Sequence, residues 1–327
     1  MPPIPVGIVG AGRSRNGLGP FMAGFLERAG CRVVAVAGSS PDRAQRNALD
    51  LEQRLTHPVH ACRDLHELAS AGIAVMVISS PVAFHLDALR AALAAGLPAL
   101  CEKPLVDEPQ LAEGLSVIDA FQQARILLAE NCQWPFALPT LVQHSPSSVV
   151  APFRQVAIGF APPRTGRAMA RGLLPHLLSV IQALTPLDPD TRVEDIRWEP
   201  PRAGAELNVL RFRLHGPQVD LAASLHQLAI SRTPPRPFWI EVNQTRFVRQ
   251  VSADYSFAFA CDGKEFPVAD PMMRLVQRFA DWVREPDPAG IDREAGLVRR
   301  RLQLYRTLLA GLGEIPPGLL RPASPET

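Results

Sequence analysis

The sequence has little that would direct it to nucleic acid or to a membrane. Its 34 Lys and Arg residues and 32 Asp and Glu residues nearly cancel, which leaves a net charge of +2. No excess of one sign is therefore available to attract a polyanion or an anionic bilayer. Apolar runs are too short to span a bilayer, and the opening MPPIPVGIVG has no basic stretch before its apolar residues. We expect a cytoplasmic protein that binds neither nucleic acid nor membrane.

Paired cysteines are also lacking. The five cysteines are odd in number, scattered, and form no C-x-x-C pair, which favours reduced thiols over a disulfide framework. The stretch HPVHACRDLH does bring four possible metal ligands together, namely His57, His60, Cys62 and His66. A zinc site needs a closed set of ligands in fixed geometry, whereas these residues are expected to span a loop, a short strand and a helix start. We therefore predict no metal site.

The first half of the chain alternates between two kinds of pattern. Short, continuous apolar runs predict buried strands at residues 6–10, 32–38, 73–80, 98–102 and 125–131. Helical spacing of apolar residues fills the segments between them, as in FHLDALRAALAAG, which ends at Gly96. Continuous apolar strands that alternate with helices predict an α/β domain with a doubly wound parallel sheet.

A glycine cluster follows the first predicted strand. The dinucleotide-binding pattern is G-x-G-x-x-G, and Gly10 and Gly12 supply its first two glycines, but position 15 is an arginine. Gly17 or Gly19 then takes the third place, in a loop lengthened by two residues. We predict that this loop holds a pyrophosphate at a helix N-terminus; the alternative is a tight turn without a ligand. The predicted contacts are Gly10, Gly12, Arg13, Arg15, Asn16, Gly17 and Leu18.

The end of the second strand bears on which dinucleotide binds. NAD sites usually carry Asp or Glu there, for the ribose hydroxyls. Here Gly38, Ser39 and Ser40 stand at that place and Arg43 follows. Two hydroxyls and a guanidinium suit a 2′-phosphate, so we favour NADP(H) over NAD(H). Ser40 also suits a helix N-cap, and the two roles are compatible.

Two motifs further along carry a family resemblance. Ser80, Pro81 and His85 fit a T-P-N-x-x-H-like motif at the end of the strand predicted at 73–80, with Val82 in place of the usual Asn. Residues 102–104 read E-K-P at the end of the next strand. In motif order and spacing, about residues 5–140 resemble the glucose–fructose oxidoreductase / inositol dehydrogenase family, known as Gfo/Idh/MocA.

This resemblance implies a Rossmann domain followed by an α+β domain with a large, mostly antiparallel sheet, and a homodimer or larger oligomer. It implies hydride transfer between a nicotinamide and a C–OH, C=O or C=N carbon of a small, often sugar-like molecule. Lys103 corresponds to the family's catalytic lysine. The residues expected near the nicotinamide end are Ser79, Ser80, Pro81, His85, Glu102 and Lys103.

The residues themselves are compatible with that role for Lys103. A lysine at the carboxyl end of a parallel strand faces the ligand crevice and can give a proton or a hydrogen bond to a carbonyl. The alternative is a surface lysine or an ion-pair partner.

The segment after the fifth predicted strand contains Asn131, Gln133 and Trp134. We expect these three residues to contact substrate; the alternative is that the segment only connects the two domains.

The second half changes character and shows three helical patterns. Strand-like segments, several of them with period-two alternation, lie at 153–161, 206–216, 218–230, 237–244, 245–252 and 256–263. In the resembling family a D-x-x-x-H helix lies early in this domain. His176 matches its histidine, but the aspartate position falls on Gly172. We predict His176 as a second catalytic and substrate-contacting residue; the alternative is an ordinary buried histidine.

The expected domains are a Rossmann domain at 1–135, a substrate and dimerisation domain at 136–315, and a tail at 316–327.

Two other functions remain compatible with the sequence. The loss of the aspartate at residue 172 fits a catalytically silent dinucleotide-binding scaffold, although the intact E-K-P argues against it. A non-redox enzyme that recycles a tightly held dinucleotide in each turnover would keep the same motifs.

Overall fold

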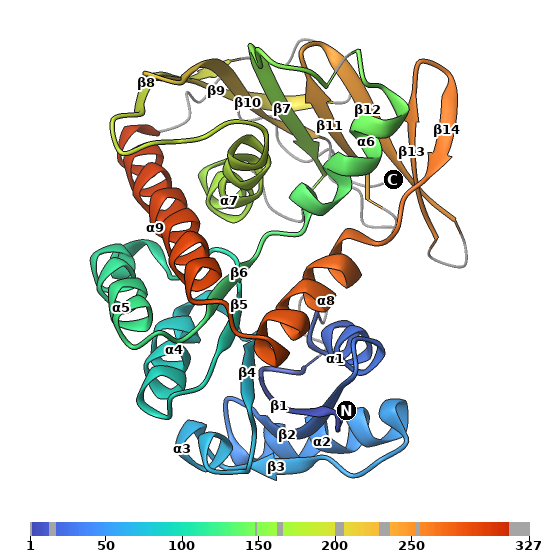
Figure 1. The fold of residues 1–327 in the computed structure, drawn as a ribbon, viewed down its shortest axis with the longest axis vertical. Helices are drawn as coiled ribbons and strands as arrows, with labels where there is room; N and C mark the ends of the chain where they lie inside the picture. Colours follow the sequence, from blue (N-terminus) through green and yellow to red (C-terminus); the bar gives the residue numbers. More distant parts are fainter. Residues whose placement is uncertain are drawn as a thin grey trace, which may run out of the picture. The chain divides into compact units, whose positions relative to one another are not determined.

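The computed structural model describes residues 2–12, 18–147, 149–161, 166–199, 206–228, 236–252 and 256–313. The chain divides into two compact units (Figure 1). The first contains residues 1–132 and 272–302, and the second contains residues 133–271 and 303–327. The sequence-based boundary near residue 135 lies close to the first division. It did not anticipate that residues 272–302 return to the first unit.

The first unit is built on a parallel six-stranded sheet. Its strand order is β3-β2-β1-β4-β5-β6, and every neighbouring pair is parallel. This order is that of a Rossmann fold, with its topological switch between β1 and β4. The prediction of a doubly wound parallel sheet is confirmed. The strands are β1 (Ile4–Val9), β2 (Cys31–Ala37), β3 (His60–Cys62), β4 (Val75–Ile78), β5 (Ala99–Glu102) and β6 (Leu128–Asn131).

Apolar residues make these strands because both faces of the sheet are covered. All four residues of β4 and of β5 are buried. The connecting helices are α1 (Leu18–Arg28), α2 (Pro41–Leu55), α3 (Leu65–Ala69), α4 (His85–Ala94) and α5 (Leu111–Gln123), with 3-10 turns η2 (Val82–Phe84) and η3 (Glu108–Gln110).

Two helices from the end of the chain complete the first unit: α8 (Pro271–Arg284) and most of α9 (Pro288–Gly311). Polar contacts hold α9 against α5 and β6. Arg299 Nε donates to Asp119 at 2.8 Å, and Arg301 Nη1 donates to Glu130 at 2.6 Å. Arg301 and Glu130 are both buried, so this ion pair lies inside the unit.

The second unit is an eight-stranded sheet with helices, as the α+β prediction requires. Its order is β14-β13-β12-β11-β7-β10-β9-β8. Neighbours are antiparallel except β7 and β10, which run parallel. The strands are β7 (Gln155–Phe160), β8 (Arg192–Glu199), β9 (Glu206–Gly216), β10 (Val219–Leu228), β11 (Phe238–Val242), β12 (Thr245–Val251), β13 (Phe257–Cys261) and β14 (Lys264–Pro267).

Three further elements belong to this unit: the 3-10 turn η4 (Trp134–Ala137) and the helices α6 (Leu138–His144) and α7 (Gly166–Leu184). Helix α7 has Pro175 in its interior. A proline has no N–H, so the carbonyl of Arg171, four residues earlier, loses its helical donor. Tyr305 of α9, which is 1% exposed, donates its hydroxyl to that carbonyl at 3.0 Å. This contact explains how α7 continues through the proline.

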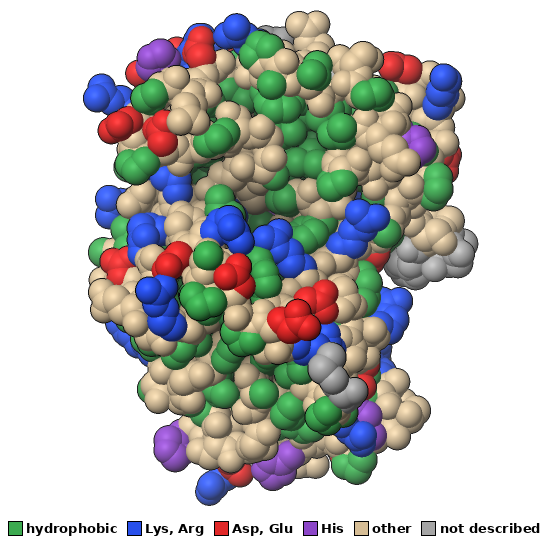
Figure 2. Space-filling model, viewed as in Figure 1, with side chains coloured by type: hydrophobic (Ala, Val, Ile, Leu, Met, Phe, Trp, Pro, Cys, Tyr) green, Lys and Arg blue, Asp and Glu red, His purple; other side chains and the backbone are tan. Residues whose placement is uncertain are grey.

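The surface agrees with the near-zero net charge. Figure 2 shows acidic and basic side chains interspersed over the face drawn. Within the described ranges, no helix is both long enough and apolar enough to cross a bilayer, and no three His, Cys, Asp or Glu side chains group in a way that could hold a metal ion.

Candidate functional site

The glycine loop leaves β1 at the topological switch point. Gly10 has φ +85°, a conformation that favours glycine. A Cβ on Gly10 would lie 2.6 Å from Ser80 Cα, and one on Gly19 would lie 2.5 Å from Ala11 Cα. Gly19 therefore lets α1 approach the loop closely, which is the part played by the third glycine of the dinucleotide pattern.

The remaining predicted contacts of this loop are only partly described. Gly12 is half-buried and Leu18, the first residue of α1, is 41% exposed. Arg13, Arg15, Asn16 and Gly17 lie outside the described residues. Their assignment to the pyrophosphate stays a prediction.

The end of β2 leads directly into α2. Ser40 is the N-cap of α2, and its hydroxyl accepts the backbone N–H of Arg43 at 3.3 Å. The side chains of Ser39 and Arg43 are exposed, and Arg43 forms no ion pair within the part of the chain that the structure describes. The capping role of Ser40 is present, and Ser39 and Arg43 remain available to a ligand.

The loop after β4 packs on the glycine loop. The Ser79 hydroxyl donates to the carbonyl of Gly10 at 2.8 Å, which fixes the two loops together. Ser80 Oγ is buried and has no hydrogen-bond partner among the described residues. Pro81 is exposed. A buried hydroxyl without a partner at the carboxyl edge of the sheet can serve a bound ligand.

His85 is buried beneath the loops at the carboxyl edge of the sheet and is not exposed on the surface. It is 1% exposed, with Nε2 2.8 Å from the Ser80 carbonyl and Nδ1 3.0 Å from the Pro104 carbonyl. Carbonyl oxygens only accept, so a neutral ring can make one of these hydrogen bonds and not both. Burial lowers the pKa of His85. The ring joins the loop after β4 to the loop after β5, so its effect on a cofactor would be to position these loops.

The E-K-P segment ends β5 at the same edge. Glu102 is buried, and burial raises its pKa to about 7, against the lowering effect of the Lys103 charge. Asn131, at the end of β6, donates its amide to Glu102 and is 1% exposed. Lys103 is half-buried and its bond to Pro104 is cis. The structure thus brings Glu102 and Asn131 together beside Lys103.

A second carboxylate supports the loop after β5. Glu130, the residue before Asn131, accepts the backbone N–H of Leu105 at 3.0 Å and the guanidinium of Arg301 at 2.6 Å. Sequence reasoning missed both Glu130 and Arg301. Their separation of 171 residues in the chain means that no local pattern could have paired them.

The predicted residues of the second unit gather in an aromatic cluster. Trp134 stacks on Phe238 with ring centroids 3.7 Å apart, and its ring lies edge-on to His176 at 6.4 Å. His176 stacks on Phe160 at 5.8 Å. The indole Nε1 of Trp134 is buried without a hydrogen-bond partner among the described residues. Trp134 and His176 therefore share one site within this unit, while Gln133 is half-buried at the start of η4.

Arg249 of β12 is a member of this cluster that sequence reasoning missed. Its guanidinium carbon lies 5.6 Å from the Trp134 ring centroid and 5.4 Å from that of Phe238. The strand TRFVRQV alternates, with Phe247 buried and Val248 exposed. An arginine in the inward phase of an alternating strand was the signal that could have revealed it.

The helix that carries His176 has space where the family aspartate is missing. Among the residues that the structure describes, a Cβ on Gly172 would have no heavy atom within 4 Å outside its own helix backbone and chain neighbours. Residue 172 lies four positions before His176 and so on the same face of α7. Packing against the described residues therefore does not force the departure from the D-x-x-x-H pattern.

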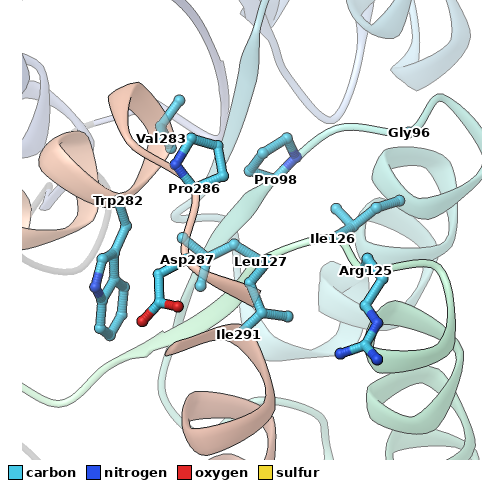
Figure 3. Close-up of a pocket in the computed structure, with 10 residues that line it drawn as sticks. All are labelled: Gly96, Pro98, Arg125, Ile126, Leu127, Trp282, Val283, Pro286, Asp287 and Ile291. Carbon is cyan, nitrogen blue, oxygen red and sulfur yellow. The ribbon is translucent and has the colours of Figure 1, made fainter. Parts of the chain in front are cut away.

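A cavity of about 120 Å³ in the first unit lies at the opposite edge of the sheet. It is lined by Pro98 and Leu127, which precede β5 and β6, by Trp282 in the last turn of α8, and by Asp287 just before α9 (Figure 3). Dinucleotides bind at the carboxyl ends of parallel strands. This cavity adjoins their amino ends and so is not the candidate cofactor site.

Comparisons with known proteins agree with this geometry. The Gfo/Idh/MocA model, described as an oxidoreductase family with an NAD-binding Rossmann fold, matches residues 4–131. An inositol 2-dehydrogenase of Streptomyces avermitilis is 40% identical over 91 residues, which are 28% of this chain and 25% of that protein. A glycosyl hydrolase family 109 protein of Streptomyces coelicolor is 30% identical over 140 residues, or 41% of this chain and 29% of that protein. The matches thus span under a third of these relatives' lengths.

One solved structure extends the likeness to the whole chain. A 3-ketoreductase from Actinomadura kijaniata, solved with NADP, superposes with a TM-score of 0.67 over 94% of this chain and 97% of that one. The sequence identity is 18%, so this likeness shows the fold alone.

Proposed function

Because the chain belongs to the Gfo/Idh/MocA oxidoreductase family through its Rossmann residues 4–131, we propose that it is an NADP(H)-dependent oxidoreductase. Its reaction moves a hydride between the nicotinamide and a C–OH, C=O or C=N carbon of a small, sugar-like molecule. The observation that carries this proposal is the carboxyl edge of the first sheet, where the glycine loop, the buried Ser80 hydroxyl and the E-K-P lysine adjoin one switch point.

The residues present fit a dinucleotide. A side chain at Gly10 would strike the Ser80 backbone, so glycine at this position lets the loop after β1 pack closely on the loop after β4 and brings the buried Ser80 hydroxyl to the glycine loop. The glycine loop would hold the pyrophosphate, and Ser79, Ser80 and Pro81 would border the nicotinamide end. A bound nicotinamide dinucleotide supplies or accepts the hydride.

Lys103 is the proposed proton-handling residue. Its ammonium can donate a hydrogen bond to a substrate oxygen and, in the reducing direction, give it a proton. Buried Glu102 is the neighbouring group whose charge depends on pH close to neutrality, since its pKa is about 7. Asn131 donates its amide to the Glu102 carboxyl and holds it in place. In the second unit, His176 and Trp134 are proposed to contact substrate.

The preference for NADP(H) rests on Ser39 and Arg43, which are exposed beside the N-cap of α2. Calorimetric titration of the protein, stripped of bound nucleotide, with NADPH and NADH tests it. We expect tighter binding of NADPH, and a loss of about tenfold or more in NADPH affinity for Arg43→Ala, about 1.4 kcal/mol, with NADH affinity unchanged.

Arg46→Ala is the matched control, because Arg46 is an exposed arginine on the same helix. Equal affinity for the two cofactors would refute the preference for NADP(H) but leave the assignment as an oxidoreductase standing. Absence of binding to both would refute the proposed function and favour a scaffold protein whose glycine loop no longer holds a dinucleotide.

A second candidate is a non-redox reaction in which the dinucleotide is recycled. The similarity to a glycosyl hydrolase family 109 protein over 140 residues favours it. Turnover of substrate by protein with tightly held cofactor, without net change in the added NADP(H), would distinguish this reaction from the oxidoreductase.

A further inference from the structure

Arg249 is an unusual residue for its position in the second unit. Cross-strand partners share a face of a sheet, and Arg249 pairs with Phe259, which itself pairs with Phe266. On the other side, Phe238 pairs with Phe160, and the Arg249 guanidinium carbon lies 5.4 Å from the Phe238 ring centroid. The arginine therefore interrupts a row of phenylalanines on the face that carries Trp134 and His176.

The hydrogen bonds of Arg249 are far from complete. A guanidinium has five N–H donors. Nη2 donates to the Arg236 carbonyl at 2.6 Å, while Nε is buried without a partner among the described residues. Within those residues no carboxylate lies at ion-pair distance from it. Burial lowers the pKa of Arg249 to about 10, and the more distant charge of Asp270 raises it.

Arg249 is half-buried, and leaving its buried Nε without an acceptor is costly. Buried charges in proteins are normally paired or fully hydrogen-bonded, and aromatic faces 5.4 to 5.9 Å away compensate only in part. A second donor in the same cluster, the indole N–H of Trp134, also has no acceptor among the described residues, and Trp134 is 3% exposed. The Arg249 guanidinium carbon lies 5.6 Å from the Trp134 ring centroid, so the two donors without acceptors belong to one cluster, and an oxyanion is the group that satisfies such donors.

We propose that Arg249, with the Trp134 indole, binds an anionic group of the substrate, so that the preferred substrates are small molecules that carry a carboxylate or a phosphoryl group. This inference rests on the proposed function in that it names the substrate class of that enzyme. Arg249 is a binding residue here, and the hydride and proton steps stay with the cofactor and Lys103.

The test is calorimetric titration with matched probes. A carboxylate arm uses acetate and glucuronate, a phosphate arm uses inorganic phosphate and glucose 6-phosphate, and glucose is the neutral reference. Each titration is run with and without saturating NADPH. We expect at least one anionic sugar to bind at least tenfold more tightly than glucose, and the stronger arm identifies the anionic group.

Three variants link the result to this side chain. Arg249→Met should lose at least tenfold in affinity for the preferred anion and leave glucose binding unchanged, while Arg249→Lys should retain part of the affinity. Arg246→Met is the control, since Arg246 lies on the same strand with its guanidinium over Trp239 at 3.9 Å and paired to Glu241 at 2.9 Å. Thermal unfolding of each variant checks that it is folded.

The outcomes separate this proposal from the proposed function. No anionic probe binding better than glucose, or equal losses for Arg249→Met and Arg246→Met, would overturn the anion site even if NADPH binds. The protein could also bind anions through Arg249 and fail to bind NADPH. That result would support the anion site and refute the assignment as an oxidoreductase.

Discussion

At the scale of single residues, Glu102 has a measurable consequence for stability. Its pKa is raised from 4.5 to about 7 by burial, whereas in the unfolded chain it ionises near 4.5. Between these pH values the unfolded state binds fewer protons than the native state, so the free energy of unfolding falls as pH rises through this window. Above about pH 7 both states are ionised and the contribution of Glu102 is constant.

Glu102→Gln should remove this dependence, because the amide does not titrate and its oxygen can still accept from Asn131. Urea unfolding of cofactor-free protein from pH 4.5 to 8 is the measurement. The difference between wild type and variant should change by no more than about 1.4 kcal/mol per pH unit, all of it below about pH 7. Parallel pH profiles for the two proteins would mean that Glu102 is already ionised in the fold at low pH.

At the scale of elements, helix α7 depends on a contact across the unit. Tyr305→Phe removes the hydroxyl that satisfies the Arg171 carbonyl and should lower the free energy of unfolding by about 1–2 kcal/mol. Pro175→Ala restores an N–H that can bond the same carbonyl within the helix. In the Pro175→Ala background, Tyr305→Phe should therefore cost clearly less. An equal cost in both backgrounds, in a double-mutant cycle by urea unfolding, would show that the hydroxyl stabilises something else.

The same helix offers a way to test the missing aspartate. The space at Gly172 admits Asp on the face of His176, where its carboxylate could orient the ring and stabilise its protonated form. With a substrate from the screen above, Gly172→Asp should raise kcat/KM by about tenfold. Gly172→Ala is the control: it should add up to about 1 kcal/mol of stability through helix propensity without raising kcat/KM. A gain shared by both variants would assign the effect to the helix and not to the carboxylate.

At the scale of the whole molecule, the sequence predicted those strands and helices that are marked by a pattern in their own segment of the chain. Continuous apolar runs located five strands of the parallel sheet, and HPVHACRDLH contained the short β3 as expected. Strand β8 was missed because Asp195, with φ +53°, and a register shift between Glu194 and Arg197 interrupt its alternation. Strand β14 has only four residues, too few for a period to be read.

The residues of the candidate site also fall into two groups: those that a local motif predicts and those that only the folded structure brings together. Lys103 and Gly10 belong to short motifs and could be located in advance, as could His176. The Glu102–Asn131 contact joins strands that are neighbours only in the folded sheet, and Arg249 enters its cluster through strand pairing. Residues that meet only through contacts between distant parts of the chain form no motif of fixed spacing in the sequence. For that reason Glu130, Arg301 and Tyr305 were found only in the structure.

The return of α8 and α9 to the first unit makes this Rossmann unit discontinuous, and that can be tested with fragments. A fragment of residues 1–135 leaves buried Glu130 without Arg301 and Asp119 without Arg299. The fragment also exposes the apolar surface that buried side chains of α8 and α9 cover. Because a domain of this size is only marginally stable, these losses remove a large share of its stability. We expect this fragment to lack a cooperative thermal transition when followed by circular dichroism.

A fusion of residues 1–132 through a flexible linker to residues 272–302 restores these pairs and should melt cooperatively. The same fusion with Arg301→Met is the control, and it should melt at a lower temperature because Glu130 is again unpaired. Cooperative melting of residues 1–135 alone, at the temperature of the fusion, would show that the parallel sheet and its own helices suffice. The C-terminal helices would then stabilise some other part of the protein.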